Sequence, residues 1–400
     1  MNGHSSATQP RPSEPVPSGP ANWQAAWQAY QQASCAVFLK PSGGGAALSL
    51  GLRHAVSIEG PQDLERACTA SLARGEGSRV AFLLAFQPDA CRGLWGGLPP
   101  GMVMAPEQWV PAPEGWPQAS AETAPNCSPQ QRRLTPGRRE WAKRVRRTTA
   151  AVASRAVDKV VLARRMDLVF DQPIDVAGTV AQLSRDNPEA TVWSWRLGGR
   201  DFVGASPELL VSYRQGRLET ACVAGTLLDG AMGAAGRWRD KERHEQAVVE
   251  DYVDRAFRSV GLTPIHSQLT EVHQGSFRHL TATVAAEANT VRSFYDLLTL
   301  LHPTPALAGE PRRAALEWIR RQEPFGRGYY GGVVGWVEES GAAEAVVAIR
   351  SALLRGPRAH LFAGGGLVGG SEPDAEWKET EAKLGVVNSA LRWGGADGQR

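Results

Sequence analysis

The stretch DFVGASPELLVSYRQGRLETACVAG, residues 201–225, decides the expected class of fold. Runs of apolar and β-branched residues typical of strands lie on both sides of YRQGRLE, a sequence typical of a hairpin turn. Other strand-like runs follow one another along the chain, with helical patterns between some of them. Strands that occur in runs favour a large sheet assembly over the alternating strands and helices of a doubly wound fold. The sequence therefore predicts a mixed α/β protein, nearer to the α+β class.

Composition divides the chain into four parts. Residues 1–20 are rich in Pro, Ser and Gly and predict a disordered tail. Residues 111–137, rich in Pro, Gln, Ser and Ala, predict an exposed linker. Between them, residues 21–110 predict a smaller N-terminal part of the fold, and residues 138–393 predict a larger part that begins with a helix.

The bulk properties are those of a globular protein. With 44 Lys plus Arg against 41 Asp plus Glu, the net charge of +3 argues against a nucleic-acid-binding surface. The five Cys are far apart and form no CxxC pair, which argues against a zinc site or a disulfide framework and favours a reducing cytoplasm. No apolar run approaches the roughly 20 residues of a membrane span, and no secretory leader is recognisable.

Lysine is scarce, and one lysine stands at the start of a strand-like run. Only six of the 44 basic residues are Lys, and Lys159 opens the apolar run KVVLARRMDLVF. A guanidinium stays charged, whereas a desolvated amine can lose its proton near neutral pH. Lys159 therefore marks a position at which the cation is expected to titrate.

Two expected helices carry pairs of acids at their starts. In DKERHEQAVVEDYVDRAF, the apolar stripe runs back by helical steps onto Glu245 and Glu242. In EWKETEAKLGVVNSAL, the stripe of Ala390 and Val386 runs back onto the polar residues Lys383, Glu379 and Glu376. Buried carboxylates need a cation, and a set of oxygen ligands with open positions suits Mg²⁺ better than zinc.

The alternative is that these acids are solvated and only complement the positive ends of the helix dipoles. For either helix alone, that alternative is the better explanation. Because the same construction occurs twice, a shared metal site is favoured.

Two charged residues interrupt runs that are expected to be buried. In VVAIRSALL, read as one strand, Arg350 shares a face with Val346 and Ala352, where an unpaired guanidinium would be costly. A substrate carboxylate or a structural acid explains it equally well. Glu208 follows a turn of Gly, Ser and Pro residues and fits a cap, a surface acid or a catalytic acid.

Glycines and histidines provide weaker indications of a site. The Gly-rich segment FAGGGLVGG, residues 362–370, fits a close approach of backbone amides to a ligand, or a tight turn. His279 and His302 fit ligand contacts, or buried histidines whose hydrogen bonds are satisfied.

These segments occur in an order that resembles one enzyme family. The motifs are KVVLAR, GASPE, AGT, KERHE, LHPTPAL, EPFGRGYYGGVVGW, AIR, FAGGGLV and EWKETEAKL. Together they resemble the chorismate-utilising enzymes, the group that includes isochorismate, salicylate, anthranilate and aminodeoxychorismate synthases. The resemblance covers about residues 138–393 and, more loosely, the N-terminal part, and KVVLAR and LHPTPAL are most similar to isochorismate synthases.

The resemblance implies a fold of large layered β-sheets wrapped by helices, with a Mg²⁺-dependent chorismate site in its core. The implied reaction converts chorismate to isochorismate, in which water adds at C2 while the C4 hydroxyl leaves. Chorismate is the implied partner, no glutaminase subunit is expected, and the implied state is a monomer or weak dimer, although the residues themselves leave oligomeric state open.

The resemblance also implies roles for individual residues. Lys159 would be the general base that activates water, and Glu208 the general acid that protonates the leaving hydroxyl. Such a base needs a lowered pKa, and such an acid a raised one. The implied metal ligands are Glu245 and Glu379, with Glu242 and Glu376 close behind. The implied substrate-binding residues are Arg350 and Lys383, for the carboxylates, together with Gly225, Thr226, His279, Tyr330, Gly364 and Gly366.

The sequence departs from the family pattern at positions outside these roles. Val223 stands where isochorismate synthases commonly have Leu, close to the place that decides which nucleophile enters. Gly326 replaces a usual Asp, and Gly365 replaces a usual Ala. Activity with altered affinity is expected.

Three functions remain open at this stage. The first is an isochorismate synthase of a siderophore, salicylate or menaquinone pathway. The second is a salicylate synthase, which also eliminates pyruvate. The third is a non-catalytic chorismate-binding relative, against which the retained acids and Lys159 argue.

Overall fold

The computed structural model describes residues 20–74, 79–117, 128–228, 240–274 and 277–391, some of them, including Gly225, Thr226 and Glu242, by backbone alone. The expected tail, residues 1–20, lies almost wholly outside them. No described helix is long and apolar enough to cross a membrane.

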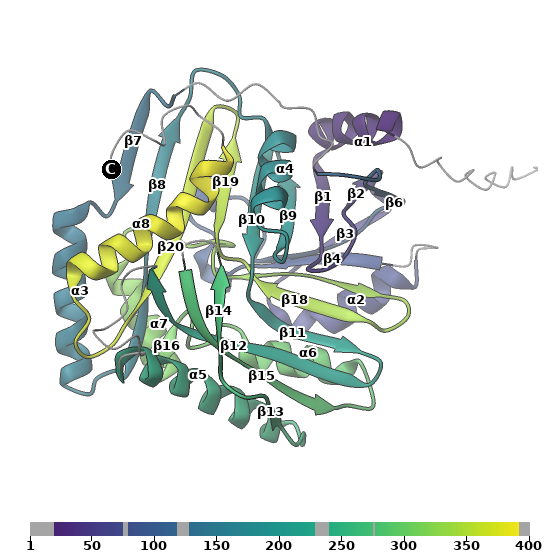
Figure 1. Cartoon of the computed structure of the whole chain (residues 1–400). Helices are drawn as coiled ribbons and strands as arrows, with labels where there is room; N and C mark the ends of the chain where they lie inside the picture. The colour runs from purple at the N-terminus through teal and green to yellow at the C-terminus, as the bar shows by residue number, and fades with distance from the viewer. Residues whose placement is uncertain (1–19, 75–78, 118–127, 229–239, 275–276, 392–400) are drawn as a thin grey trace, which may run out of the picture.

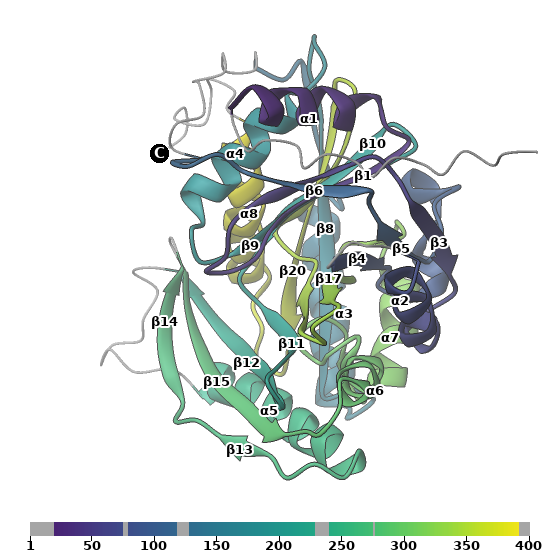
Figure 2. The ribbon, with the colours of Figure 1, turned by 90° about the vertical axis from the view of Figure 1, so that its right-hand side faces the viewer.

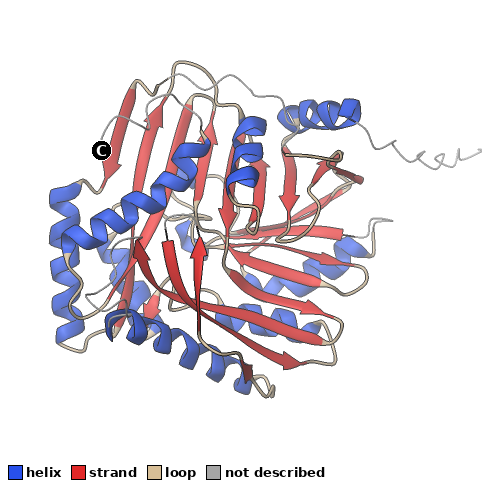
Figure 3. Ribbon diagram, in the orientation of Figure 1, coloured by secondary structure: helices blue, strands red, loops and turns tan. Residues whose placement is uncertain are grey.

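Two large antiparallel sheets form the centre of the fold (Figure 1, Figure 3). We call them sheet A and sheet B. Sheet A has the order β16 (Gly309–Glu310), β8 (Lys159–Val169), β20 (Arg358–Leu367), β19 (Ser351–Arg355), β10 (Arg200–Ser206), β9 (Thr191–Leu197), β1 (Cys35–Lys40), β2 (Ala47–Leu50) and β6 (Gln108–Pro111), and β7 (Gln131–Thr135) also pairs with β8. Sheet B has the order β13 (Ile265–His266), β15 (Phe277–Glu287), β12 (Arg217–Leu228), β11 (Leu209–Arg214), β18 (Ala343–Val347), β17 (Val333–Glu338), β4 (Arg79–Leu84), β5 (Gly101–Ala105) and β3 (His54–Ile58), and β14 (Thr270–Gln274) also pairs with β15.

Helices cover the outer faces of both sheets. The described helices are α1 (Pro20–Gln32), α2 (Leu64–Leu72), α3 (Arg138–Ala153), α4 (Val176–Asp186), α5 (Asp240–Ser259), α6 (Arg292–Leu301), α7 (Arg312–Gln322) and α8 (Pro373–Ala390). α1, α4 and α8 pack on sheet A, and α2, α5 and α6 pack on sheet B (Figure 2). Successive side chains of a strand point to opposite faces of its sheet, so one strand contributes to two hydrophobic cores. On β10, Phe202 packs between the two sheets, whereas Val203 faces the helices. The expected α+β fold of layered sheets wrapped by helices is confirmed.

The stretch of residues 201–225 contains the predicted hairpin and a crossing of the chain from one sheet to the other. Arg214 pairs with Arg217 across Gln215 and Gly216, which have φ values of 50° and 81°, as in a two-residue turn of type I′. Before it, the chain leaves sheet A at Ser206 and enters sheet B at Leu209.

A second crossing corrects the interpretation of Arg350. The segment from Ala343 to Arg355 is two strands in different sheets, and Arg350 lies in the link between them with a φ of 48°. It therefore shares no strand face with Val346 and Ala352. The apolar run continues through the break because both sheets contribute buried residues here.

The N-terminal strands belong to both sheets, so residues 21–110 are built into the same body as residues 138–393. The segment 111–137, expected to be an exposed linker, contains β7, which pairs with β8.

The buried face of α8 also differs from the prediction. The helix residues that are buried are Glu376, Thr380, Leu384, Val387 and Ala390. Glu379, Lys383 and Val386 are only half-buried. The C-terminal half of the helix packs on sheet A, while Glu379 and Lys383, on a neighbouring side of its middle, line a pocket.

Candidate active site

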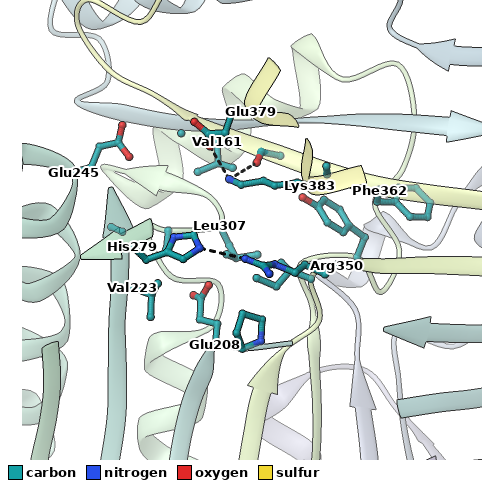
Figure 4. Close-up of a pocket in the computed structure, with 18 of the residues that line it drawn as sticks. Val161, Glu208, Val223, Glu245, His279, Leu307, Arg350, Phe362, Glu379 and Lys383 are labelled. Atoms are coloured by element: carbon teal, nitrogen blue, oxygen red, sulfur yellow. Dashed lines mark hydrogen bonds and ion pairs between the residues drawn. The ribbon is translucent and has the colours of Figure 1, made fainter. Parts of the chain in front are cut away.

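One pocket collects side chains from both sheets, both crossings and two helices (Figure 4). Its polar lining comprises Lys159, Glu208, Glu245, His279, Tyr330, Arg350, Glu379 and Lys383. Its apolar lining includes Val161, Val223, Leu307, Ile349 and Phe362, with Gly364 and Gly366 on β20. Residues more than 200 positions apart in the sequence thus surround a single space.

Lys159 lies at the start of β8 and points into this pocket. Its side chain is only 2% exposed, and its Nζ lies 3.9 Å from Oε2 of Glu245. Gly366, on the neighbouring strand β20, leaves room for it, since a Cβ there would lie 3.0 Å from Cε of Lys159. A buried amine is therefore held against one carboxylate.

Glu208 lies in the first crossing, between β10 and β11. Burial raises the pKa of its carboxyl to about 7, although the nearby cations Lys383, Lys159 and Arg350 act in the opposite direction. A carboxyl with this pKa is protonated in a large fraction of molecules near neutral pH. It can therefore donate a proton inside the pocket.

Arg350 lies in the second crossing, and the two crossings are hydrogen-bonded to each other. The amide of Val347 donates to Glu208 O at 3.0 Å, and the amide of Ala205 donates to Arg350 O at 3.2 Å. Nη2 of Arg350 donates to Nε2 of His279 at 3.2 Å (Figure 4).

Burial keeps His279 in the form that can accept this hydrogen bond. Burial, together with the charges of Arg350 and Lys383, lowers the pKa of His279 to about 3, so its ring is neutral. Burial also lowers the pKa of Arg350 to about 10, which still leaves the guanidinium charged at neutral pH. The crossing thus presents a permanent cation.

A second cation comes from α8. Nζ of Lys383 lies 2.7 Å from Oε1 of Glu379 and donates to Gly364 O at 3.1 Å (Figure 4). The hydroxyl of Tyr330 approaches Gly364 closely: a Cβ on Gly364 would lie only 2.8 Å from it. Burial raises the pKa of Tyr330, so the hydroxyl stays protonated and can donate a hydrogen bond.

The four acids proposed as metal ligands lie in different environments. Glu245 of α5 and Glu379 of α8 line the pocket. Glu376 is buried and lies by Gly365, where a Cβ would stand 3.2 Å from its Oε2. The side chain of Glu242 lies outside the described part of the structure.

The described side chains contain no group of three or more His, Cys, Asp or Glu placed to hold a metal ion. Mg²⁺, however, is commonly held by only one or two protein carboxylates and keeps several waters. The pocket-facing carboxylates of Glu245 and Glu379 have the hard oxygen donors that fit this requirement.

Besides Glu242 and Glu376, three further candidate residues do not line the pocket by a described side chain. Gly225 and Thr226 lie on β12, where the register with β15 shifts between Ala224 and Thr226, and Thr226 pairs with His279. His302 is buried outside the pocket, and its Nε2 lies 3.0 Å from Ala85 O. His302 therefore corresponds to the alternative of a buried, satisfied histidine.

The departures from the family pattern have structural counterparts. Val223 lines the pocket. A Cβ on Gly326 would lie 2.4 Å from Ala90 O, so no side chain fits there unless the backbone moves. Gly365 lies beside Glu376 and enlarges the space around that carboxylate.

Sequence reasoning placed Val223 near the site but missed most of the apolar wall of the pocket. Val161 follows Lys159 by two positions on β8 and so shares its face, which was the available signal. Leu307 and Ile349 lie in links between elements, where periodicity gives no signal.

Two cations, a carboxyl with a raised pKa and a buried amine surround one pocket, an arrangement that suits a small anionic molecule and proton transfer to or from it. A family model described as "Chorismate binding enzyme" matches residues 113–392. The chain belongs to this family.

Individual relatives support the assignment. The chain is 34% identical over 302 residues to isochorismate synthase EntC of Escherichia coli, a match that covers 72% of this chain and 77% of the relative. It is 34% identical over 265 residues to isochorismate synthase MenF of Bacillus subtilis, which covers 63% of this chain but only 55% of the relative.

The fold comparison extends over nearly the whole chain. The solved structure of MenF, the menaquinone-specific isochorismate synthase of Escherichia coli, superposes with a TM-score of 0.76 at 24% identity. That match covers 92% of this chain and 90% of the other. The N-terminal strands therefore belong to the shared fold as well.

Proposed function

We propose that the protein is an isochorismate synthase, which converts chorismate to isochorismate with the help of Mg²⁺. The observation that carries the proposal is that a buried amine, Lys159, and a carboxyl with a raised pKa, Glu208, face one pocket that also contains Arg350 and Lys383. The relatives named as isochorismate synthases support it.

In the proposed reaction, Lys159 takes a proton from a water molecule as that water adds at C2 of the ring. Glu208 gives its proton to the C4 hydroxyl, which leaves as water. One water is consumed and one is released, so the product is an isomer of the substrate. The two roles follow from the two groups: the carboxyl of Glu208 has a raised pKa and can donate a proton, and the amine of Lys159 can accept one.

The cations of the pocket are proposed to bind the two carboxylates of chorismate. Arg350 and Lys383 come from different elements, the second crossing and α8, and so reach the pocket from separate directions. Charge-assisted hydrogen bonds of this kind offset the loss of hydration of an anion. The hydroxyl of Tyr330 adds a neutral donor.

The proposal is tested by incubating the purified protein with chorismate and Mg²⁺ and separating the products by chromatography. Isochorismate alone supports the proposal. Salicylate together with pyruvate would assign the protein to the salicylate synthases instead, and unchanged chorismate would contradict both activities.

Mg²⁺ would be held by Glu245 and Glu379, with Glu242 and Glu376 behind them. When bound, it supplies positive charge that offsets the negative charge of the substrate carboxylate. Glu245 and Glu379 would otherwise face an anion, because both line the same pocket.

Removal of the metal with EDTA is expected to lower turnover of chorismate by at least about 100-fold, since the carboxylates then repel the substrate. The rate is measured by product chromatography before and after dialysis against EDTA. Addition of Mg²⁺ in excess should restore it. Undiminished turnover after EDTA treatment would contradict the metal requirement.

The variant Gly366→Ala is expected to lower kcat about tenfold with little loss of thermal stability. The new Cβ would lie 3.0 Å from Cε of Lys159 and 3.3 Å from Oε2 of Glu245, so the flexible amine must move by a few tenths of an ångström. Gly385→Ala on α8 is the matched control, because a Cβ there meets nothing within 4 Å. Equal kcat values in the two variants would contradict this role of Gly366.

A further inference from the structure

Strand β8 has a gap along one of its edges, directly beside the pocket. β16 pairs with Lys159 and Val160, and β7 pairs with residues 165–169. Between them, residues 161–164 pair with none of the described strands on this edge, whereas their other edge pairs with β20. Buried backbone groups left in such a gap need other hydrogen-bond partners.

Two side chains fill this gap. Nη2 of Arg327 donates to Val161 O at 2.7 Å, and the amide of Ala163 donates to Oε1 of Glu323 at 2.8 Å. Nη1 of Arg327 donates to Leu307 O at 2.8 Å. The guanidinium therefore joins β8 to the segment that contains Leu307.

The two side chains also form an ion pair that is almost fully buried. Nε of Arg327 donates to Oε2 of Glu323 at 2.9 Å, and the side chains are 2% and 4% exposed. The guanidinium lies 4.3 Å from the ring centre of Phe86. Neither Glu323 nor Arg327 lines the pocket, so neither is placed to touch a ligand there.

The groups held by this pair belong to the pocket wall. Val161 and Leu307 both line the pocket, and Val161 is two residues from Lys159 on the same strand face. The amide of Val161 also donates to Ala308 O at 3.0 Å, which continues the contact between the two segments. Beside the buried amine, one edge of β8 is thus held by side chains at Val161 and Ala163, while β20 holds the other edge.

We propose that Glu323 and Arg327 are positioning residues that fix the β8 backbone, and with it Lys159, relative to the adjacent segment at Leu307. The effect on turnover rests on the proposed function. An arginine suits this position because the separate nitrogens of its planar fork reach Glu323 and two carbonyl groups at once, whereas the donors of an ammonium all lie on one nitrogen.

The test is the variant Arg327→Lys, which keeps the charge beside Glu323 but loses the fork. It is expected to lower kcat for chorismate about 100-fold, because a misplacement of about 1 Å has an effect of this size. KM is expected to change less than about threefold, because the hydrogen bonds of Arg327 go to Glu323, Val161 and Leu307, whereas the proposed carboxylate-binding residues Arg350 and Lys383 donate to other groups. Because a loss of folded protein would also lower the apparent kcat without a change in KM, the rate is expressed per folded molecule, with the folded fraction measured by circular dichroism.

Arg196→Lys is the matched control. Arg196 lies in the same sheet, donates to Asp201 at 2.8 Å and to Ala33 O at 3.1 Å, and is remote from the pocket lining. Its replacement should lower the melting temperature and leave kcat within about twofold of the wild type. A kcat in Arg327→Lys equal to that of Arg196→Lys would overturn the proposal.

Two further measurements keep the test decisive. If Arg327→Lys does not fold, the double variant Glu323→Gln with Arg327→Met removes both buried charges together, and the same fall in kcat is expected. If the wild type does not convert chorismate, the proposed function fails, and amide hydrogen exchange decides the positioning role. Faster exchange in Arg327→Lys than in the wild type, confined to residues 159–163 and 304–308, supports the positioning role. Unchanged exchange at these residues refutes it.

Discussion

Replacement of Lys159 by Gln is expected to lower kcat for water addition to chorismate by about 100- to 10,000-fold. General-base catalysis commonly contributes a factor of this size, and an amide cannot take the proton. Lys159 is buried against Glu245 in the pocket, and Gln has nearly the length needed to occupy the same space. Substrate binding should change far less than turnover.

Two variants separate the charge of Lys159 from its basicity. Lys159→Arg keeps a cation near Glu245 but supplies a group that does not lose its proton, so it should be about as inactive as Lys159→Gln. Lys143→Gln, at a position with a half-exposed side chain on α3, should leave the rate unchanged. Single-turnover measurement of isochorismate gives the rates, and full activity in Lys159→Gln would refute the assignment of the base.

Replacement of Glu208 by Gln is expected to lower kcat by a similar factor, because the C4 hydroxyl then leaves without a proton. The structure links this role to pH. Since burial raises the pKa of Glu208 to about 7, the acid form predominates below about pH 7 and is lost above it. For the wild type, kcat/KM should therefore fall as pH rises through about 7.

The pH dependence provides the measurement that identifies Glu208 as the acid. In Glu208→Gln, which lacks the titrating carboxyl, the residual rate should no longer fall as the pH rises above 7. Glu287→Gln, whose side chain on β15 is 77% exposed, should keep the wild-type profile. A wild-type decline retained in Glu208→Gln would assign the titration to another group.

Much of the site could be predicted from residue types and their spacing. The scarcity of lysine indicated Lys159, and helical steps back from an apolar stripe indicated Glu245, which is buried and lines the pocket. The hairpin of residues 213–219 was evident because Gln-Gly supports the backbone of a tight turn. These patterns depend only on residues close together in the sequence. Such patterns predict the structure correctly where one face of a single helix or strand is buried.

The crossings and the gap in β8 could not be predicted in this way. At Arg350, both flanking strands are buried, so the apolar pattern continues through the break and gives no sign that the chain changes sheets. Glu323 and Arg327 bind backbone amide and carbonyl groups, which are the same for nearly every residue type, so the residue types of their partners give no signal. Their partners are chosen by the arrangement of β7, β8 and β16, which only the assembled fold reveals.

The strand order has a consequence for synthesis of the protein on the ribosome. β19 and β20 lie between β8 and β10 in sheet A, and β17 and β18 lie between β4 and β11 in sheet B. A nascent chain that has reached only residue 332 therefore leaves the facing edges of β4, β8, β10 and β11 open, and open edges are templates for aggregation. Both sheets, and the pocket between them, can close only after Val333–Leu367 has emerged, which makes chaperone protection of the unfinished chain important.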